Sequence, residues 1–350
     1  MHKERNSSFE LLRIISILLI IMHHYAVHGG FDFYRESSWR LCFVQCLGMG
    51  GKIGVNLFVL ISGYFLCKSN VNFTKIVKLE LEVIFYCIAI GIVFHLFFPE
   101  TESLKDLFLE LTPLRSKRYW FYNTYIVLVL LCPFINKLID SLEKKEFRKL
   151  LILLFVLWCF IPTIPKFGAL EFSCLGWFVF LYCCAAYFRI YSDDLPFKAK
   201  SYILCGLGFY ILLLLSVLPF VFFFDGKYRN KFDYFLPMNS ILVFACSIAF
   251  FLGFLKLDFG CKRWINFISS TTFGVYLIHS NHLVSPFLWN DLLENSKFLN
   301  TDKLYLHAFC SVVLVYFCCV FIDLVRKYAF EKPFFRLVEK IRGRCNSLNE

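Results

Sequence analysis

The apolar stretch from Phe9 to Val27 contains ionisable residues whose spacing suits acid–base chemistry. Arg13 and His24 are eleven residues apart, which on an α-helix places them on one face, about 16 Å apart along the axis. A neutral imidazole can take a proton from a hydroxyl at physiological pH, and a guanidinium can hold an anionic group. Glu10, one turn before Arg13, can pair with it and reduce the cost of burying both charges. The pattern predicts a helix with a cation near its start and a base near its end.

Two other interpretations of these residues stay open at this point. Arg13 can extend to the cytoplasmic interface, and His24 can belong to the outer interfacial belt beside Tyr25, with no chemical role for either. His24 and His28 lie at positions i and i+4, a spacing that metal ligands use. Because no carboxylate or HExxH context accompanies them, we predict no metal site.

Two lysines begin a later apolar stretch and form a second cationic feature. Lys75 and Lys78 are three residues apart, so they share one helix face and can bind the phosphates of an anionic ligand. Lysines are also enriched in the cytoplasmic loops of membrane proteins, and Lys78 can pair with Glu82. The spacing alone leaves both interpretations open.

Helices in a membrane must position these residues. The 350 residues are 59% hydrophobic and 18% charged, which excludes a typical soluble domain with about 25% charged residues. The apolar residues form continuous blocks of roughly 20, the length of a membrane-crossing helix, and lack the alternation of an outer-membrane barrel strand. We therefore predict an all-α polytopic membrane protein with about ten transmembrane helices, spanning roughly residues 9–27, 48–66, 77–98, 119–135, 150–164, 172–190, 202–224, 235–257, 265–289 and 305–325.

The charged gaps between the blocks predict the orientation of the chain. Lys and Arg are concentrated in one alternating set of gaps, and such loops face the cytoplasm. Both termini are then cytoplasmic, residues 100–117 lie outside, and residues 326–350 form a basic cytoplasmic tail. Topology explains the net charge of +11, so we predict no nucleic-acid partner. Most of the 16 cysteines lie inside apolar blocks, which argues against a disulfide framework, and residues 1–350 are predicted to form one integral domain.

The sequence resembles the membrane-integral acyltransferase family 3. The first apolar stretch of that family carries a basic residue, ten intervening residues and a histidine, and Arg13 and His24 match this pattern in register. Many relatives carry an acid where this chain has Asn56. Further segments similar to the family, in the family's order, are residues 54–66, which end in Ser-Gly-Tyr-Phe-Leu, and residues 73–78, 119–133 and 273–279.

The resemblance implies transfer of an acyl group, usually acetyl, from cytoplasmic acyl-coenzyme A to a hydroxyl of an extracytoplasmic or membrane-linked glycan. It implies His24 and Arg13 as catalytic residues and Lys75 and Lys78 as donor-binding residues. His24 can be a general base or can carry the acyl group covalently, and both remain open. Secondary candidates near the pocket are Glu10, Asn56, Ser62, Tyr64, Trp120, Tyr276 and His279.

The same resemblance implies the surroundings of the protein. Acyl-coenzyme A is a donor substrate and no cofactor is bound. The partners are membrane lipid and a glycan or lipid-linked saccharide, and the location is a cell membrane, the bacterial cytoplasmic membrane. The acceptor stays open among surface polysaccharides, peptidoglycan, lipid-linked sugars and small metabolites.

A transporter or flippase for a lipid-linked saccharide or polysaccharide is the main alternative, because it would also have many spans and buried charges. Transporters commonly contain paired halves with helices broken at corresponding positions. The sequence shows no such pairing, and its candidate residues concentrate in the first three apolar stretches, which favours an enzyme.

Overall fold

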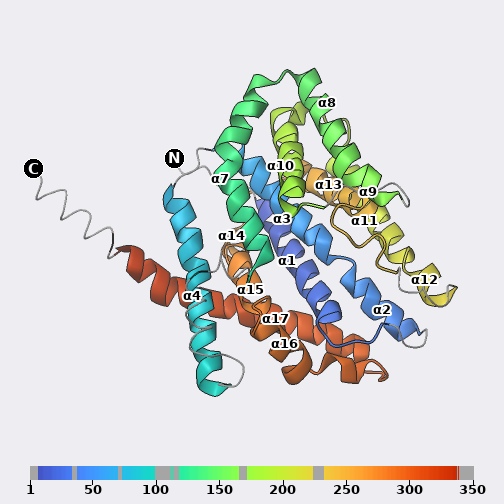
Figure 1. The fold of residues 1–350 in the computed structure, drawn as a ribbon, viewed down its shortest axis with the longest axis vertical. Coiled ribbons are helices and arrows are strands. Elements are labelled where there is room, and N and C mark those ends of the chain that lie inside the picture. Colours follow the sequence, from blue (N-terminus) through green and yellow to red (C-terminus); the bar gives the residue numbers. More distant parts are fainter. Residues whose placement is uncertain are drawn as a thin grey trace, which may run out of the picture.

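The structure is a computed structural model, and it describes residues 7–33, 38–69, 73–98, 112, 118–164, 172–223, 232–336 and 338. Every regular element among these residues is a helix (Figure 1). In this part of the chain, five helical segments are long and apolar enough to cross a membrane, and two shorter apolar helices accompany them. The chain is therefore an all-α membrane protein, while the count of ten spans and the orientation of the termini stay predictions. The loop predicted to lie outside, residues 100–117, falls outside the described residues except for Thr112.

Helices lie in each of the ten apolar stretches. Nine of the stretches contain α1 (Ser7–Val27), α3 (Gly51–Leu66), α4 (Phe73–Phe97), α7 (Trp120–Ser141), α8 (Lys144–Phe155) continuing through a π turn (Val156–Phe160) into α9 (Ile161–Thr163), α10 (Cys174–Ile190), α11 (Ala199–Leu215) followed by α12 (Leu218–Phe222), α13 (Ile241–Lys256) and α17 (Leu304–Arg326). One further helix, α2 (Trp39–Gly48), precedes α3 and was not predicted. Ser38 caps it by accepting a hydrogen bond from the Leu41 N–H at 3.1 Å.

The stretch predicted as a single span over residues 265–289 is broken into short helices. These are α14 (Arg263–Ser269), α15 (Thr272–His279), α16 (Val284–Pro286) and a π turn (Phe287–Leu292). At the first break, the hydroxyls of Ser270 and Thr271 donate to carbonyls three residues earlier, both at 2.7 Å. Such side-chain bonds compete with the helical backbone ladder, which explains the interruption. The second break leaves His279 at the end of a helix and Ser280 just beyond it.

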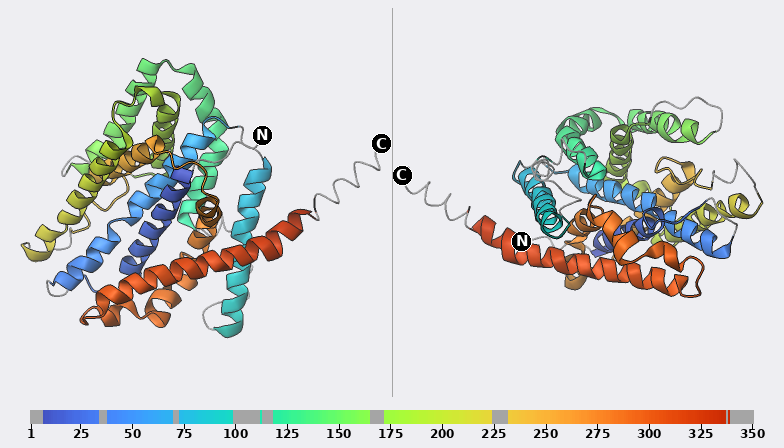
Figure 2. Two further views of the ribbon diagram at one scale, coloured as in Figure 1. Left: turned by 180° about the vertical axis from the view of Figure 1, so that it is seen from behind. Right: turned by 60° about the horizontal axis from the view of Figure 1, so that its bottom comes forward.

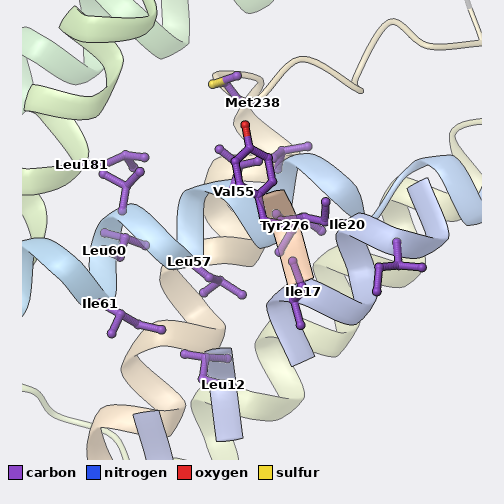
Figure 3. Packing of buried hydrophobic residues seen from close by; sticks show 14 of the residues in the cluster. Leu12, Ile17, Ile20, Val55, Leu57, Leu60, Ile61, Leu181, Met238 and Tyr276 are labelled. Carbon is purple, nitrogen blue, oxygen red and sulfur yellow. The ribbon is translucent and has the colours of Figure 1, made fainter. Parts of the chain in front are cut away.

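The core of the bundle is built around α1. This helix packs against α2, α3, α13, α14, α15 and α17. Figure 3 shows Leu12 and Ile17 of α1 near Leu57 of α3, and all three are fully or almost fully buried. The two helices approach closely because Gly54 has no side chain: a Cβ there would lie 2.5 Å from the carbonyl oxygen of Ser16.

Buried charges join α4 to α17, which cross one another (Figures 1 and 2). The fully buried Asp323 accepts hydrogen bonds from the Tyr86 hydroxyl and from Arg326 Nε, both at 2.8 Å. Arg326 Nη2 also donates to Glu82 Oε1 at 2.8 Å. Glu82 is therefore paired with α17 and not with Lys78, the pairing that the spacing allowed.

Residues 326–336, the start of the stretch predicted as a basic cytoplasmic tail, are helical. Arg326 is buried, and its guanidinium is neutralised by carboxylates, including Glu331 at 2.8 Å. The helix continues through a π turn (Lys327–Glu331) to Arg336. Carboxylates of α4 and α17 make the burial of Arg326 possible, because they compensate its charge.

Candidate active site

Arg13 and Glu10 form an ion pair near the start of α1, which confirms the pairing that their spacing predicts. Arg13 Nη1 donates to both carboxylate oxygens of Glu10 at 3.1 Å, and Ser269 Oγ in α14 donates to Glu10 Oε2 at 2.6 Å. Glu10 is buried, whereas 25% of the Arg13 side chain is exposed. The Arg13 guanidinium also lies 5.9 Å from the centre of the Phe65 ring. Glu10 thus holds Arg13 in place between α1 and α3.

A cavity of about 60 Å³ adjoins the His24 side chain near the other end of α1. Its walls come from α1, α3, α7 and α15. Lys52 and Trp120 border it, and Lys52 Nζ lies 5.2 Å from the centre of the Trp120 ring. The cavity therefore combines an imidazole, an ammonium group and aromatic walls. Three further lining residues are labelled in Figure 3: Ile20, Val55 and Tyr276.

A chain of hydrogen bonds connects the His24 ring to the end of α15. Ser280 Oγ lies 3.4 Å from His24 Nδ1 and 3.3 Å from His279 Nε2. His279 Nδ1 lies 2.5 Å from the carbonyl oxygen of Val275. His279 is fully buried, so its ring is fixed between these two partners.

The donor and the acceptor of each hydrogen bond in this series follow from its last acceptor, the Val275 carbonyl oxygen. A carbonyl oxygen only accepts hydrogen bonds, so the neutral His279 ring carries its hydrogen on Nδ1 and accepts from Ser280 on Nε2. Ser280 Oγ then accepts from His24 Nδ1–H. This network selects the His24 tautomer whose lone pair is on Nε2, which becomes the basic atom of the ring.

His23 has a hydrogen-bond partner different from that of His24. Its Nδ1 donates to the carbonyl oxygen of Gly48 at 2.6 Å, where α2 ends. A Cβ on Gly51 would lie 2.4 Å from the His23 side chain, so the ring packs directly on the start of α3. His23 also borders the cavity, but its hydrogen bond gives it an anchoring role at the α2–α3 junction.

The imidazole rings around His24 form a cluster. The centre of the His24 ring lies 4.9 Å from that of His28 and 5.0 Å from that of His279. Within the described part of the chain, no three or more His, Cys, Asp or Glu side chains are grouped so that they could hold a metal ion.

Comparison with known protein families identifies the chain at the level of its family. A family model described as an acyltransferase domain matches residues 6–324, most of the 350-residue chain. The chain belongs to acyltransferase family 3. No curated protein and no solved structure matches it. The matched region contains both ends of α1, the cavity and the Ser280–His279 chain, so all of these belong to the acyltransferase domain.

The residues that the sequence indicated for this acyltransferase occupy three kinds of position. His24, Trp120 and Tyr276 line the cavity, and His279 lies behind His24 in the hydrogen-bond chain. Arg13 does not line the cavity, since it lies at the other end of α1. Lys75 is exposed at the start of α4. Lys78 borders a separate cleft of about 370 Å³ between α4 and the end of α17, with its Nζ 4.2 Å from the centre of the Phe335 ring.

Asn56 and Tyr64 do not line the cavity of the acyltransferase, although they lie on the same helix as Lys52. The fully buried Asn56 donates to the Met238 carbonyl at 2.8 Å and accepts from Trp177 Nε1 at 2.9 Å. Its side chain thus ties α3 to its neighbours.

The Tyr64 hydroxyl accepts from Arg189 Nη1 at 2.6 Å, which joins α3 to α10. Ser62 lies within hydrogen-bonding reach of Tyr125 in α7. Gly63 permits close packing, since a Cβ there would lie 3.1 Å from Ala185 Cβ. These residues of α3 position the helix that carries Lys52.

Two residues of the site were not among the candidates drawn from the sequence. Ser280 directly follows His279 in the sequence, but a serine beside a histidine is too common to indicate a role. Lys52 lies near the end of its apolar stretch, from where a lysine can extend to water without any chemical role. A stronger signal was its charge inside an apolar stretch, where ionisable groups are functional candidates by default.

Proposed function

We propose that this chain is an O-acyltransferase that moves an acyl group, acetyl in the simplest case, from cytoplasmic acyl-coenzyme A to a hydroxyl of a glycan or lipid-linked saccharide on the outer side of a cell membrane. Membership in the acyltransferase family supports acyl transfer. The observation that carries the proposal is the cavity in which His24, oriented by Ser280, shares a space with Lys52.

The cavity side chains supply each proton and charge that acyl transfer requires. His24 Nε2 takes the proton of the acceptor hydroxyl while the hydroxyl oxygen attacks the thioester carbonyl carbon. The Lys52 ammonium stabilises the negative charge that develops on the carbonyl oxygen. When the carbon–sulfur bond breaks, the His24 imidazolium returns its proton to the thiolate of coenzyme A. While the ring is charged, its Nδ1–H bond to Ser280 becomes charge-assisted and therefore stronger.

The donor must reach this cavity from the side where Arg13 lies. Arg13 and His24 are separated by about 16 Å along α1, so the two residues serve different parts of an extended donor. We assign Arg13 to the anionic part of acyl-coenzyme A or to its path through the protein, with Lys75 and Lys78 as cations nearer the cytoplasm. The reactive thioester then lies at His24.

The family match favours this enzyme over the transporter or flippase that the sequence left as an alternative. A flippase should be indifferent to a thioester, whereas the proposed enzyme consumes one. An assay of thiol release from acyl-coenzyme A by purified protein therefore distinguishes the two.

The test of the proposal is His24→Ala in membranes or detergent, with protein levels matched. Thiol release and acceptor acylation should fall by about 10² to 10⁴, the usual cost of deleting a general base. His23→Ala is the matched control, since it removes a neighbouring imidazole that anchors the α2–α3 junction. It should lower stability with much less effect on turnover of the folded fraction. Activity lost with His23→Ala and kept with His24→Ala would refute the assignment.

A further inference from the structure

A second cleft, of about 400 Å³, has one lining residue in common with the cavity of His24. Lys52 borders both spaces, so the ammonium group of the proposed catalytic cavity also marks the boundary of the cleft. The other walls come from the end of α9, from the residues just before α10 and from the segment that leads into α13. The main lining side chains are Thr163, Phe172, Tyr234, Asn239 and Ser240.

The polar walls of this cleft are fixed by hydrogen bonds. Tyr234 donates its hydroxyl hydrogen to the Thr163 carbonyl at 2.6 Å, and Asn239 Nδ2 donates to the Trp158 carbonyl at 2.9 Å. Ser240 Oγ donates to the Phe235 carbonyl at 2.7 Å. These bonds leave the Tyr234 hydroxyl oxygen and the Asn239 amide oxygen with capacity to accept further hydrogen bonds, whereas Ser240 Oγ already accepts one from the Val243 N–H at 3.3 Å. The cleft is therefore an ordered polar surface.

The chemistry of the lining residues suits a sugar ring. Phe172 has 41% of its surface exposed, and Tyr234 adds a second aromatic ring. Aromatic faces pack against the C–H faces of a sugar, while amide and hydroxyl groups bind its hydroxyls. Among the lining residues that the structure describes, Lys52 is charged and none is a carboxylate, so these residues suit a neutral or acidic sugar better than a cationic one. Its volume lies within the range of about 300–1,000 Å³ typical of small-molecule sites.

We propose that this cleft is the acceptor subsite and that it holds one saccharide unit of the acceptor. Held there, a hydroxyl of the sugar enters the adjoining cavity beside Lys52 and meets His24. The inference rests on the proposed function for the direction of the reaction, but saccharide binding itself does not require any chemistry. Among the acceptors that the sequence left open, this subsite favours a saccharide.

Binding of defined sugars in the absence of acyl-coenzyme A tests the subsite. The probes are the methyl glycosides of a hexose, an N-acetylhexosamine and a hexuronic acid, with affinity for the purified full-length chain measured by saturation-transfer NMR. Phe172→Ala should weaken binding of the best probe by about 2- to 13-fold, the loss expected for one aromatic packing contact. Phe172→Trp should retain binding, because it keeps an aromatic face.

The control is Phe223→Ala at the end of α12, which removes an 82% exposed ring that does not line the cleft. It should leave binding unchanged. If no probe binds, or if Phe172→Ala binds as well as the unmodified chain, the subsite is refuted. Thiol release from acyl-coenzyme A, measured on the same preparations, reports separately on the proposed function. Sugar binding that depends on Phe172, without any thiol release, would retain the subsite and refute the acyltransferase mechanism.

Discussion

Ser280→Ala gives the sharpest test of how the site controls its base. The substitution removes the hydroxyl that lies 3.4 Å from His24 Nδ1 and 3.3 Å from His279 Nε2, without touching either ring. In the proposed mechanism the bond to Ser280 exists in the ground state and strengthens when His24 takes a proton. Only that strengthening accelerates the reaction, because catalysis depends on interactions that are stronger in the transition state.

The size of the loss in kcat follows from the difference between the neutral and the charge-assisted form of this hydrogen bond. A neutral hydrogen bond contributes about 0.5–1.5 kcal/mol, and one to a charged group contributes about 1.5–3 kcal/mol. The difference of about 1–1.5 kcal/mol corresponds to a loss in kcat of roughly 5- to 13-fold. Binding of acyl-coenzyme A should be unchanged, since Ser280 lies behind the His24 ring and not at the donor side near Arg13.

The assay is thiol release from acyl-coenzyme A together with acceptor acylation, at matched levels of folded protein. Ser280→Thr keeps a hydroxyl and should restore most of the activity. Ser285→Ala, which removes another buried hydroxyl from the same region of the chain, is the control and should leave kcat unchanged. An unchanged kcat in Ser280→Ala would refute the hydrogen-bond argument. A loss as large as that of His24→Ala would also refute it, because Ser280 would then be acting as a nucleophile.

Three further predictions address the donor, the α4–α17 contact and the topology. Lys75→Ala combined with Lys78→Ala should weaken acyl-coenzyme A binding in a calorimetric titration, more strongly at low salt because ions screen phosphate contacts; equal affinity at all salt concentrations would remove both lysines from the donor site. Asp323→Ala should lower the free energy of unfolding by about 3 kcal/mol, the lower end for a broken buried pair, because Arg326 keeps its other two carboxylate partners, and an unchanged unfolding temperature would contradict this. A cysteine at Ser141 should not react with an impermeant thiol reagent in intact cells beyond the level of the parent chain, whereas labelling would reverse the predicted orientation.

Local information in the sequence was sufficient to predict where helices lie and which residues contact each other within one helix. Continuous apolar blocks predict where helices lie, since each block must satisfy its own backbone hydrogen bonds in a membrane. The Glu10–Arg13 pair was predictable because residues three apart on a helix are neighbours. The placement of Arg13 and His24 at opposite ends of one helix follows from their number of intervening residues. The family resemblance, carried by the same short motifs, was confirmed by the match over residues 6–324.

Tertiary structure decided everything that depends on contacts between distant segments. Ser280 reaches His24 across 256 positions, and this contact exists only because the ninth apolar stretch breaks and turns its end toward α1. Lys52 and Trp120 come together from α3 and α7, and Arg326 is buried only because α4 brings Glu82 to it. Periodicity reports which face of a helix is apolar, but it does not report which helix that face meets. The sequence therefore determined the helices and the position of His24 on its helix, while the packing of the helices determined the cavity, the hydrogen bonds of the His24 ring and the cleft that shares Lys52 with the cavity.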